Sequence, residues 1–138
     1  MTTATLRPIE TVREYYRRVD EGDFAAAFEL WGPRATVRFG DQPEVEGREA
    51  IAELVSNMVV PIAQQVSHVI VRPYEVDGSG DSTTVICEAV VTYKMLRSGN
   101  VISHNAVTIS EISPTGAIIA QRNVGDLRPV IEDHHSHS

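Results

Sequence analysis

Three runs of β-strand character, separated by two turn signals, occupy the segment Asp81–Asp126. The runs are Ser82–Met95, Val101–Ile112 and Ala117–Gly125, and the turn signals are Arg97–Asn100 and Ser113–Gly116. Apolar side chains recur at every second position of the first run, a period that is typical of a half-buried strand. Three such strands joined by short turns form a meander, which must lay one face on an apolar layer.

The first half of the chain is predicted to supply that layer as helices, because apolar residues recur there at helical spacing. The expected elements are a helix from Pro8 to about Asp20, a helix Phe24–Trp31, a strand Ala35–Phe39, a loop Gly40–Gly47, a helix from Arg48 to about Pro61, a β run Gln65–Arg72 and a turn Pro73–Gly80. Helices followed by an antiparallel sheet indicate an α+β fold. We expect one domain over residues 1–130 and a disordered tail over residues 131–138.

Composition excludes several classes of function. The net charge of −7 argues against a nucleic-acid or anionic-membrane partner. The single cysteine, Cys87, lies within a strand run, so it is interpreted as a small core residue and a reducing compartment is expected. The N-terminus does not resemble a signal peptide, and no apolar run has membrane-spanning length, so a cytoplasmic location is predicted.

The pairing of the three strands can be predicted from tight turns, since residues opposite one another share a face. The expected rows on one face are Tyr93–His104–Gly125, Val91–Ala106–Asn123 and Ala89–Thr108–Gln121. This mixture of small, apolar and polar groups is typical of a cavity lining. A strongly curved sheet wrapped over a helix would leave a conical pocket, whose wall would also include Tyr15, Trp31, Phe39 and Met58.

Four segments of the chain resemble a known superfamily. They are Val19–Asp23, Ala35–Val37, Glu46–Ile51 and Gly125–Pro129. They are similar to the cone-shaped superfamily that includes nuclear transport factor 2, ketosteroid isomerase, limonene epoxide hydrolase and the SnoaL-like polyketide cyclases. The likeness covers roughly Ile9 to Val130, and it implies three N-terminal helices packed on a strongly curved, mostly antiparallel sheet, in a homodimer.

The catalytic residues of these relatives are largely absent. The ketosteroid isomerase base falls on Phe39 and its oxyanion carboxyl on Thr108, so only its oxyanion tyrosine has a match, Tyr15. The main positions of limonene epoxide hydrolase fall on Val91, Ala89 and Asn123, and its supporting positions on Val37 and Phe39. The acid/base aspartate of the SnoaL-like cyclases also falls on Asn123, which cannot act as a general base.

His104 is the predicted proton-transfer residue, because histidine alone titrates near neutral pH when unperturbed. Tyr15 or Tyr93 would stabilise an enolate-like oxygen. The predicted substrate-binding residues are Trp31, Phe39, Met58, His68, Val91, Thr108, Gln121 and Asn123. The alternatives are that His104 is solvated at a hairpin end, that His68 is a hydrogen-bonded sheet histidine and that Tyr15 packs in the core.

Two functions remain open on this basis. The first is cofactor-independent isomerisation, cyclisation or dehydration of a small apolar carbonyl compound such as a polyketide or terpenoid; the second is a non-catalytic ligand-binding or assembly module with the same pocket. No metal site and no cofactor are predicted, since ligand spacings and glycine-rich phosphate loops are missing from the sequence. An apolar outer sheet face predicts a homodimer; its residues are Ile86, Val90, Val107, Ile109 and Val124.

Overall fold

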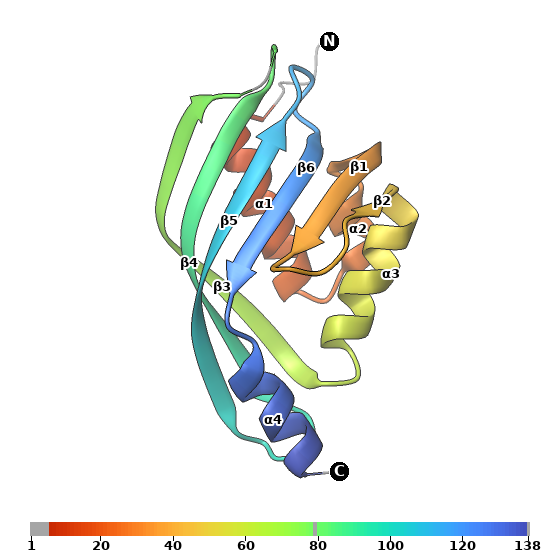
Figure 1. Ribbon diagram of the computed structural model, residues 1–138, viewed down its shortest axis with the longest axis vertical. Helices are drawn as coiled ribbons and strands as arrows, with labels where there is room; N and C mark the ends of the chain where they lie inside the picture. The colour runs from red at the N-terminus through yellow and green to blue at the C-terminus, as the bar shows by residue number, and fades with distance from the viewer. Residues whose placement is uncertain (1–5, 79, 138) are drawn as a thin grey trace.

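The computed structural model describes residues 6–78 and 80–137, so residues 1–5 of the expected domain, residue 79 and residue 138 of the expected tail lie outside it. The elements are α1 (Pro8–Asp20), α2 (Phe24–Phe28), β1 (Trp31–Phe39), β2 (Val45–Glu46), α3 (Arg48–Val59), β3 (Ala63–Asp77), β4 (Thr83–Met95), β5 (Val101–Ile112), β6 (Ile118–Gly125) and α4 (Arg128–Ser136). The strands form one sheet in the order β2-β1-β6-β5-β4-β3, in which only the β1–β6 pair is parallel. The α+β class with a curved, mostly antiparallel sheet is confirmed (Figure 1).

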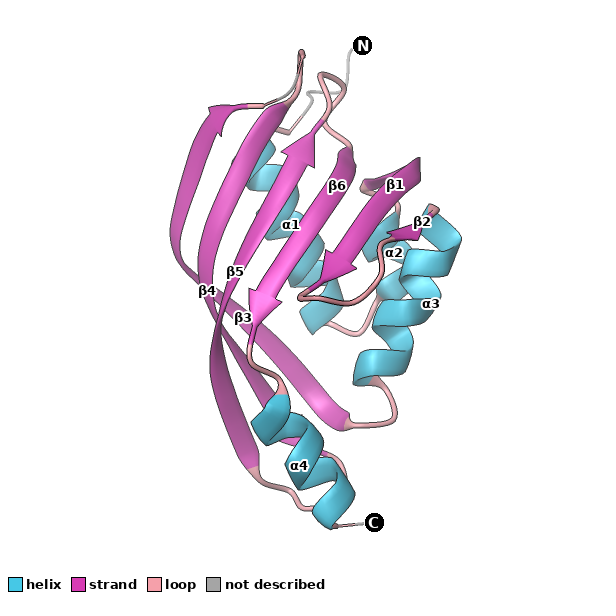
Figure 2. Cartoon of the chain, in the orientation of Figure 1, coloured by secondary structure: helices cyan, strands magenta, loops and turns pink. Residues whose placement is uncertain are grey.

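Helix α1 lies on the inner face of this sheet (Figure 2). It begins at Pro8, whose fixed φ suits the first turn, and its buried residues recur every three to four positions. The helix ends before Gly22, which has a φ of +81° and donates its N–H to the carbonyl of Val19. Only glycine adopts this φ without strain, so the sharp turn into α2 depends on it.

Aromatic rings fill much of the space inside the bend of the sheet. Trp31 is fully buried, and its ring centroid lies 5.3 Å from that of Tyr15 and 5.6 Å from that of Phe28. Tyr15 and Phe28 also meet edge to face at 5.5 Å, an arrangement that aromatic rings favour. This ring cluster joins α1, α2 and β1 into one apolar core.

The expected register of the meander is wrong by two residues in both hairpins. The N–H of Met95 bonds to the carbonyl of Asn100, so the first turn is wider than expected and Lys94 pairs with Val101. The observed rows are Ala89–Ala106–Gly125, Cys87–Thr108–Asn123 and Val85–Ser110–Gln121. A shift of two leaves every side chain on its predicted face, because successive residues of a strand alternate between faces.

Three element boundaries also differ from expectation. Strand β3 continues through Pro73 to Asp77, where a turn was expected; β3 is an edge strand, so an absent N–H is tolerated there. Strand β1 begins at Trp31, which was assigned to the second helix. Val45–Glu46 forms a short strand within the expected loop.

Helix α4 occupies most of the region expected to be a disordered tail. Asp133 accepts hydrogen bonds from Ser98 Oγ at 2.6 Å and from Asn100 Nδ2 at 2.7 Å, and Val130 is buried. These contacts tie α4 to the β4–β5 turn. Hence the polar turn that widened the hairpin also holds the C-terminal helix.

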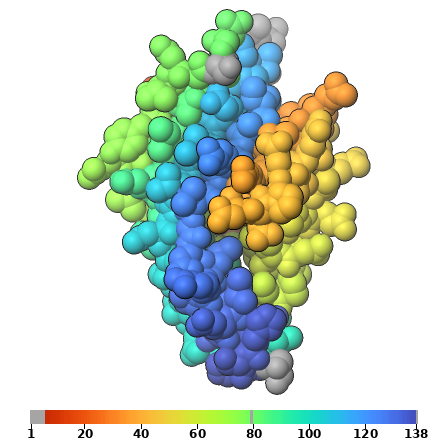
Figure 3. Space-filling view, viewed as in Figure 1, coloured from red at the N-terminus to blue at the C-terminus, as the bar shows by residue number. Residues whose placement is uncertain are grey.

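The other face of the sheet is the one seen in Figure 3, where strands β3 to β6 (green to blue) lie at the surface and α1 is hidden behind them. Val69 is 60% exposed on this face and Val124 is 52% exposed. The remaining apolar side chains predicted to lie here are half-buried, namely Ile86, Val90, Val107 and Ile109.

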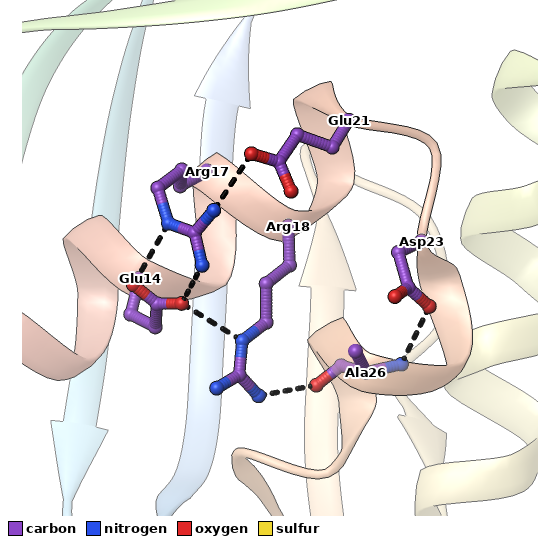
Figure 4. A network of polar contacts seen from close by, with 6 residues as sticks. All are labelled: Glu14, Arg17, Arg18, Glu21, Asp23 and Ala26. Atoms are coloured by element: carbon purple, nitrogen blue, oxygen red, sulfur yellow. Dashed lines mark hydrogen bonds and ion pairs between the residues drawn. The ribbon is translucent and has the colours of Figure 1, made fainter.

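A charged network covers the solvent side of α1 (Figure 4). Glu14 accepts hydrogen bonds from Arg17 and Arg18, and Arg17 also binds Glu21 at 2.7 Å. Arg18 donates to the carbonyl of Ala26 at 2.8 Å, which ties α1 to α2. Hydrogen bonds from Arg17, and more weakly from Arg18, lower the pKa of Glu14 to about 2.

This lowered pKa predicts an acid-dependent contribution to stability. The folded pKa of about 2 lies below the ordinary value of 4.5, so the stabilisation is present above pH 4.5 and is lost as the pH falls toward 2. Replacing Glu14 with Gln should lower the free energy of unfolding at pH 7 by about 1 kcal/mol or less, because the pair is solvent-screened. Thermal unfolding from pH 7 to pH 2 should show the two proteins converging in acid.

Glu53→Gln is the matched control, since Glu53 is an exposed helical carboxylate that makes no ion pair within the described part of the chain. It should keep the pH dependence of the unmodified protein. Parallel unfolding curves for Glu14→Gln and the unmodified protein across the whole pH range would contradict the assignment.

Candidate functional site

Asp20 and His68 form the tightest side-chain pair between α1 and the sheet. His68 Nδ1 lies 2.6 Å from Asp20 Oδ1, and the backbone N–H of His68 donates to Asp20 Oδ2 at 2.8 Å. One carboxylate therefore holds both the ring and the main chain of the histidine. The pair is partly accessible, with the side chain of His68 14% exposed and that of Asp20 22% exposed.

The imidazole of His68 is also fixed by Tyr16. The two rings stack with their centroids 4.4 Å apart and an interplanar angle of 30°. Tyr16 precedes Asp20 by four residues, so the α-helical period places both on the side of α1 that faces β3. A carboxylate oxygen can only accept, so Nδ1 carries the proton in this contact and Nε2 of the neutral ring keeps its lone pair.

An open groove of about 310 Å³ lies beside this pair. Its lining residues come from α1, the turn after it and β3, and they are Arg13, Tyr16, Arg17, Asp20, Glu21, His68 and Ile70. Arg17 is occupied by Glu14 and Glu21, whereas Arg13 makes no ion pair with any residue that the structure describes. The groove thus presents an oriented histidine with a free guanidinium at its rim.

Beneath Tyr16, polar side chains form a strip on the inner face of β5 and β6. Gln121 donates from Nε2 to Ser110 Oγ at 3.0 Å, and Asn123 donates from Nδ2 to Gln121 Oε1 at 3.1 Å. Thr108 lies in the same strip and is buried. The predicted binding residues Thr108, Gln121 and Asn123 are therefore close to one another, although the expected register was wrong.

His104 and Tyr93 also face inward and stack on each other, with ring centroids 5.8 Å apart. His104 Nδ1 lies 3.1 Å from the carbonyl oxygen of Asn105, and no carboxylate bonds to this ring within the described residues. The space expected beside Gly125 is taken by the ring itself, since a Cβ at Gly125 would come within 3.3 Å of it. Neither His104 nor Tyr93 lines the groove, and their catalytic role stays a prediction.

His68 and His104 nevertheless belong to one row of the sheet. Val91 pairs with His68 on one side and with His104 on the other. The two histidines are therefore two strand spacings apart, about 10 Å. Val91, which was predicted to bind substrate, is buried between them.

The remaining predicted residues lie away from the groove. Tyr15 and Trp31 belong to the ring cluster, where burial raises the pKa of Tyr15 well above its usual value. Phe39 is at the end of β1 and Met58 is half-buried on α3. A second open depression of about 380 Å³ lies between α2 and α3, but none of these four residues lines it.

Sequence reasoning missed Asp20, Tyr16 and Arg13. Asp20 was interpreted only as the end of the first helix, because its partner lies 48 residues away. One signal in the sequence could have found Asp20. A carboxylate in the last turn of a helix interacts unfavourably with the helix dipole, so a stabilising contact from another segment is expected there. Tyr16 is one of the residues that recur at helical spacing in α1, and that pattern by itself indicates only core packing.

In the part of the chain that the structure describes, no group of three or more His, Cys, Asp or Glu residues could hold a metal ion. None of the helices described is both long enough and apolar enough to cross a membrane.

The comparison with protein families shows which family this chain belongs to. The model of the SnoaL-like domain matches residues 12–121. This protein belongs to the SnoaL-like family. No curated protein matches its sequence.

Solved structures similar to this SnoaL-like protein share its fold. Hexachlorocyclohexane dehydrochlorinase LinA-type3 from Novosphingobium barchaimii is 18% identical with a TM-score of 0.74, over 86% of this chain and 84% of that one. A Novosphingobium aromaticivorans protein provisionally described as a scytalone dehydratase is 12% identical with a TM-score of 0.76, over 87% and 83%. A Bacillus subtilis protein provisionally described as an isomerase is 25% identical with a TM-score of 0.67, over 95% and 94%.

The Asp20 contact predicts the tautomer of His68 in this SnoaL-like protein. The neutral imidazole should carry its proton on Nδ1, and Asp20→Ala should shift it toward Nε2 because the acceptor is gone. Long-range ¹H–¹⁵N correlation spectra of ¹⁵N-histidine-labelled protein measure both nitrogens. Asp133→Ala, at the far end of the molecule on α4, should leave the His68 signals unchanged; identical His68 nitrogen shifts in Asp20→Ala and the unmodified protein would refute the contact.

Proposed function

We propose that this SnoaL-like protein catalyses cofactor-independent proton transfer on a small apolar carbonyl compound, with His68 as the acid/base. The observation that carries the proposal is the contact of His68 with Asp20 at the edge of an open groove. A histidine oriented by a carboxylate, with its second nitrogen free, is the arrangement that general acid–base catalysis needs. His104 lacks such an orienting group among the described residues.

In this mechanism His68 Nε2 removes a proton from the carbon next to the substrate carbonyl. The electron pair of the broken C–H bond moves to the carbonyl oxygen and forms an enolate. Asp20 stabilises the imidazolium that results and keeps the ring in place. Return of the proton to another carbon completes an isomerisation. Loss of a β-hydroxyl as water, which takes the same proton, completes a dehydration. Attack of the enolate carbon on a second carbonyl, whose oxygen then takes the proton from His68, completes a cyclisation.

The structural relatives support this class of chemistry. Dehydrochlorination removes a proton and chloride, dehydration removes water, and many isomerases move a proton between two atoms. All three reactions named for these relatives are compatible with one histidine base in the same fold. The fold alone does not identify the reaction, because one fold hosts many functions.

Deuterium exchange tests the proposal directly. The probe is 2-tetralone, a small bicyclic ketone, whose exchange of the C1 and C3 hydrogens in D₂O is followed by NMR. We expect exchange faster than in buffer alone, and His68→Gln should reduce the enzymatic rate by about 10² to 10⁴-fold. Asp20→Asn should reduce it by a smaller factor, because the base is still present but less well oriented.

His135→Gln is the matched control, since His135 is an exposed histidine on α4. It should keep the full exchange rate. His104→Gln separates the two histidine candidates: loss of exchange in His104→Gln with retention in His68→Gln would transfer the role to His104. No exchange above buffer by the unmodified protein would favour the ligand-binding or assembly module instead.

We also propose that a second copy of this chain covers the outer face of the sheet. Exposed Val69 and Val124 flank half-buried apolar side chains there, and a contiguous apolar patch on a soluble protein marks an interaction surface. A two-fold axis brings the same patch of both copies together, so two copies can bury this face simultaneously.

Light scattering after size-exclusion chromatography should therefore give twice the 15.2 kDa chain mass. The double variant Val69→Lys and Val124→Lys should be monomeric, because it would place unpaired positive charges in a desolvated interface. Val60→Lys is the control: Val60 is 56% exposed beyond the end of α3, and its replacement should leave the dimer intact. A monomer for the unmodified protein at micromolar concentration would rule this interface out.

A further inference from the structure

Two buried hydroxyl groups lie together inside the protein without hydrogen-bond partners. Tyr16 is 6% exposed and Thr108 is 4% exposed, and neither Tyr16 Oη nor Thr108 Oγ1 makes a hydrogen bond to the residues that the structure describes. A buried polar group left unsatisfied costs about 1–3 kcal/mol, and such groups are few in native proteins. Two at one place indicate a binding position for a polar group that the chain itself does not supply.

Among the side chains around the two hydroxyls, Gln121 is already committed. The Tyr16 hydroxyl lies close to Thr108 and Gln121, but in a geometry that forms no hydrogen bond. The amide of Gln121 is used on both sides, by Ser110 and by Asn123. Burial raises the pKa of Tyr16, so its hydroxyl stays protonated and can donate.

The hydroxyl pair is connected to the proposed base through one ring. Tyr16 lines the groove and stacks on His68, while its hydroxyl lies further in, beside Thr108 on β5. The proton-transfer group thus stacks on the face of this tyrosine ring, and the two donors lie at its hydroxyl end.

We propose that Tyr16 Oη and Thr108 Oγ1 form a subsite for an oxygen atom of the substrate. The inference rests on the proposed function of His68 and narrows its substrate class: a cyclic or aryl ketone, rather than a hydrocarbon or halocarbon without oxygen. A carbonyl oxygen accepts two hydrogen bonds, so it satisfies both hydroxyls at once. Carbon-bound chlorine is too weak an acceptor to do so.

The subsite also fits the charge that develops during the reaction. When His68 takes the proton from the carbon beside the carbonyl, the electron pair moves onto the oxygen held by the two hydroxyls. Neutral donors fixed in a buried place stabilise such an oxyanion more than they stabilise the ketone. Arg13 of the groove makes no ion pair with the described residues, but it lies at the solvent-exposed rim.

Binding of a matched pair of probes tests the subsite. 2-Tetralone and tetralin have the same two rings, and only the first has an oxygen. Isothermal titration calorimetry should show tighter binding of 2-tetralone to the unmodified protein. Tyr16→Phe and Thr108→Val should each weaken binding of 2-tetralone by about 2- to 12-fold, the range expected for one hydrogen bond, and leave tetralin binding unchanged.

Two variants control for nonspecific effects. Tyr74→Phe removes a tyrosine hydroxyl from the exposed part of β3, and Thr92→Val removes a threonine hydroxyl that bonds to Ser103 on the outer side of the sheet. Both should keep the preference for 2-tetralone. Tyr16→Phe retains the ring that stacks on His68. Thermal unfolding of this variant should show no loss of stability, since the removed hydroxyl makes no hydrogen bond to the described residues.

The outcomes separate this inference from the proposed reaction. His68→Gln should abolish deuterium exchange but keep the preference for 2-tetralone over tetralin. If exchange is absent throughout and the preference still disappears in Tyr16→Phe and Thr108→Val, the oxygen subsite stands and the reaction fails. A preference that persists in the Tyr16→Phe, Thr108→Val double variant would overturn the subsite. So would equal affinity for the two probes, no binding of 2-tetralone at millimolar concentration, or a crystal structure with only a water molecule between the hydroxyls.

Discussion

The hydrogen bonds between Asp20 and His68 join the end of α1 to the edge strand of the sheet, and the arrangement of the site depends on them. A carboxylate in the last turn of a helix is opposed by the helix dipole, whose negative end lies there. Two hydrogen bonds from one histidine, through its ring and its main chain, offset that repulsion. They also fix the angle at which α1 meets β3, and with it the position of Tyr16.

Two adjacent tyrosines on α1 have different surroundings. Tyr15 contacts Phe28 and Trp31, whereas Tyr16 stacks on His68 and places its hydroxyl near Thr108. Their ring centroids are only 4.9 Å apart, yet one ring belongs to the apolar cluster and the other to the groove. The 100° rotation between successive helical residues produces this division. The resemblance to ketosteroid isomerase points to Tyr15 as the oxyanion tyrosine. The surroundings of the two rings favour Tyr16 instead for the proposed oxygen subsite.

Much of the fold follows from local pattern, because strand runs and their alternation depend on residues that are close in sequence. The bounds of β5 match the predicted run, and each strand of the meander presents its predicted face. The register of the hairpin cannot be predicted from this local pattern, since it depends on how Met95 and Asn100 close the turn. Helix α4 does not follow either, because Asp133 holds it through contacts with a turn more than thirty residues earlier. The Asp20–His68 pair was missed for the same reason, being a contact between distant segments.

The alternation of the strands also separates two kinds of change that evolution can make in this SnoaL-like protein. Inward residues of β5 and β6, such as Thr108 and Asn123, lie in the polar strip beneath Tyr16, where a substitution changes the hydrogen-bonding groups of the proposed subsite. Outward residues of the same strands, such as Val107 and Val124, pair with each other on the opposite face. A substitution there changes what packs on the outside of the sheet and leaves the polar strip untouched. The proposed oxygen subsite and the proposed dimer face can therefore vary independently on a single pair of strands, because side chains on opposite faces of a sheet point away from each other.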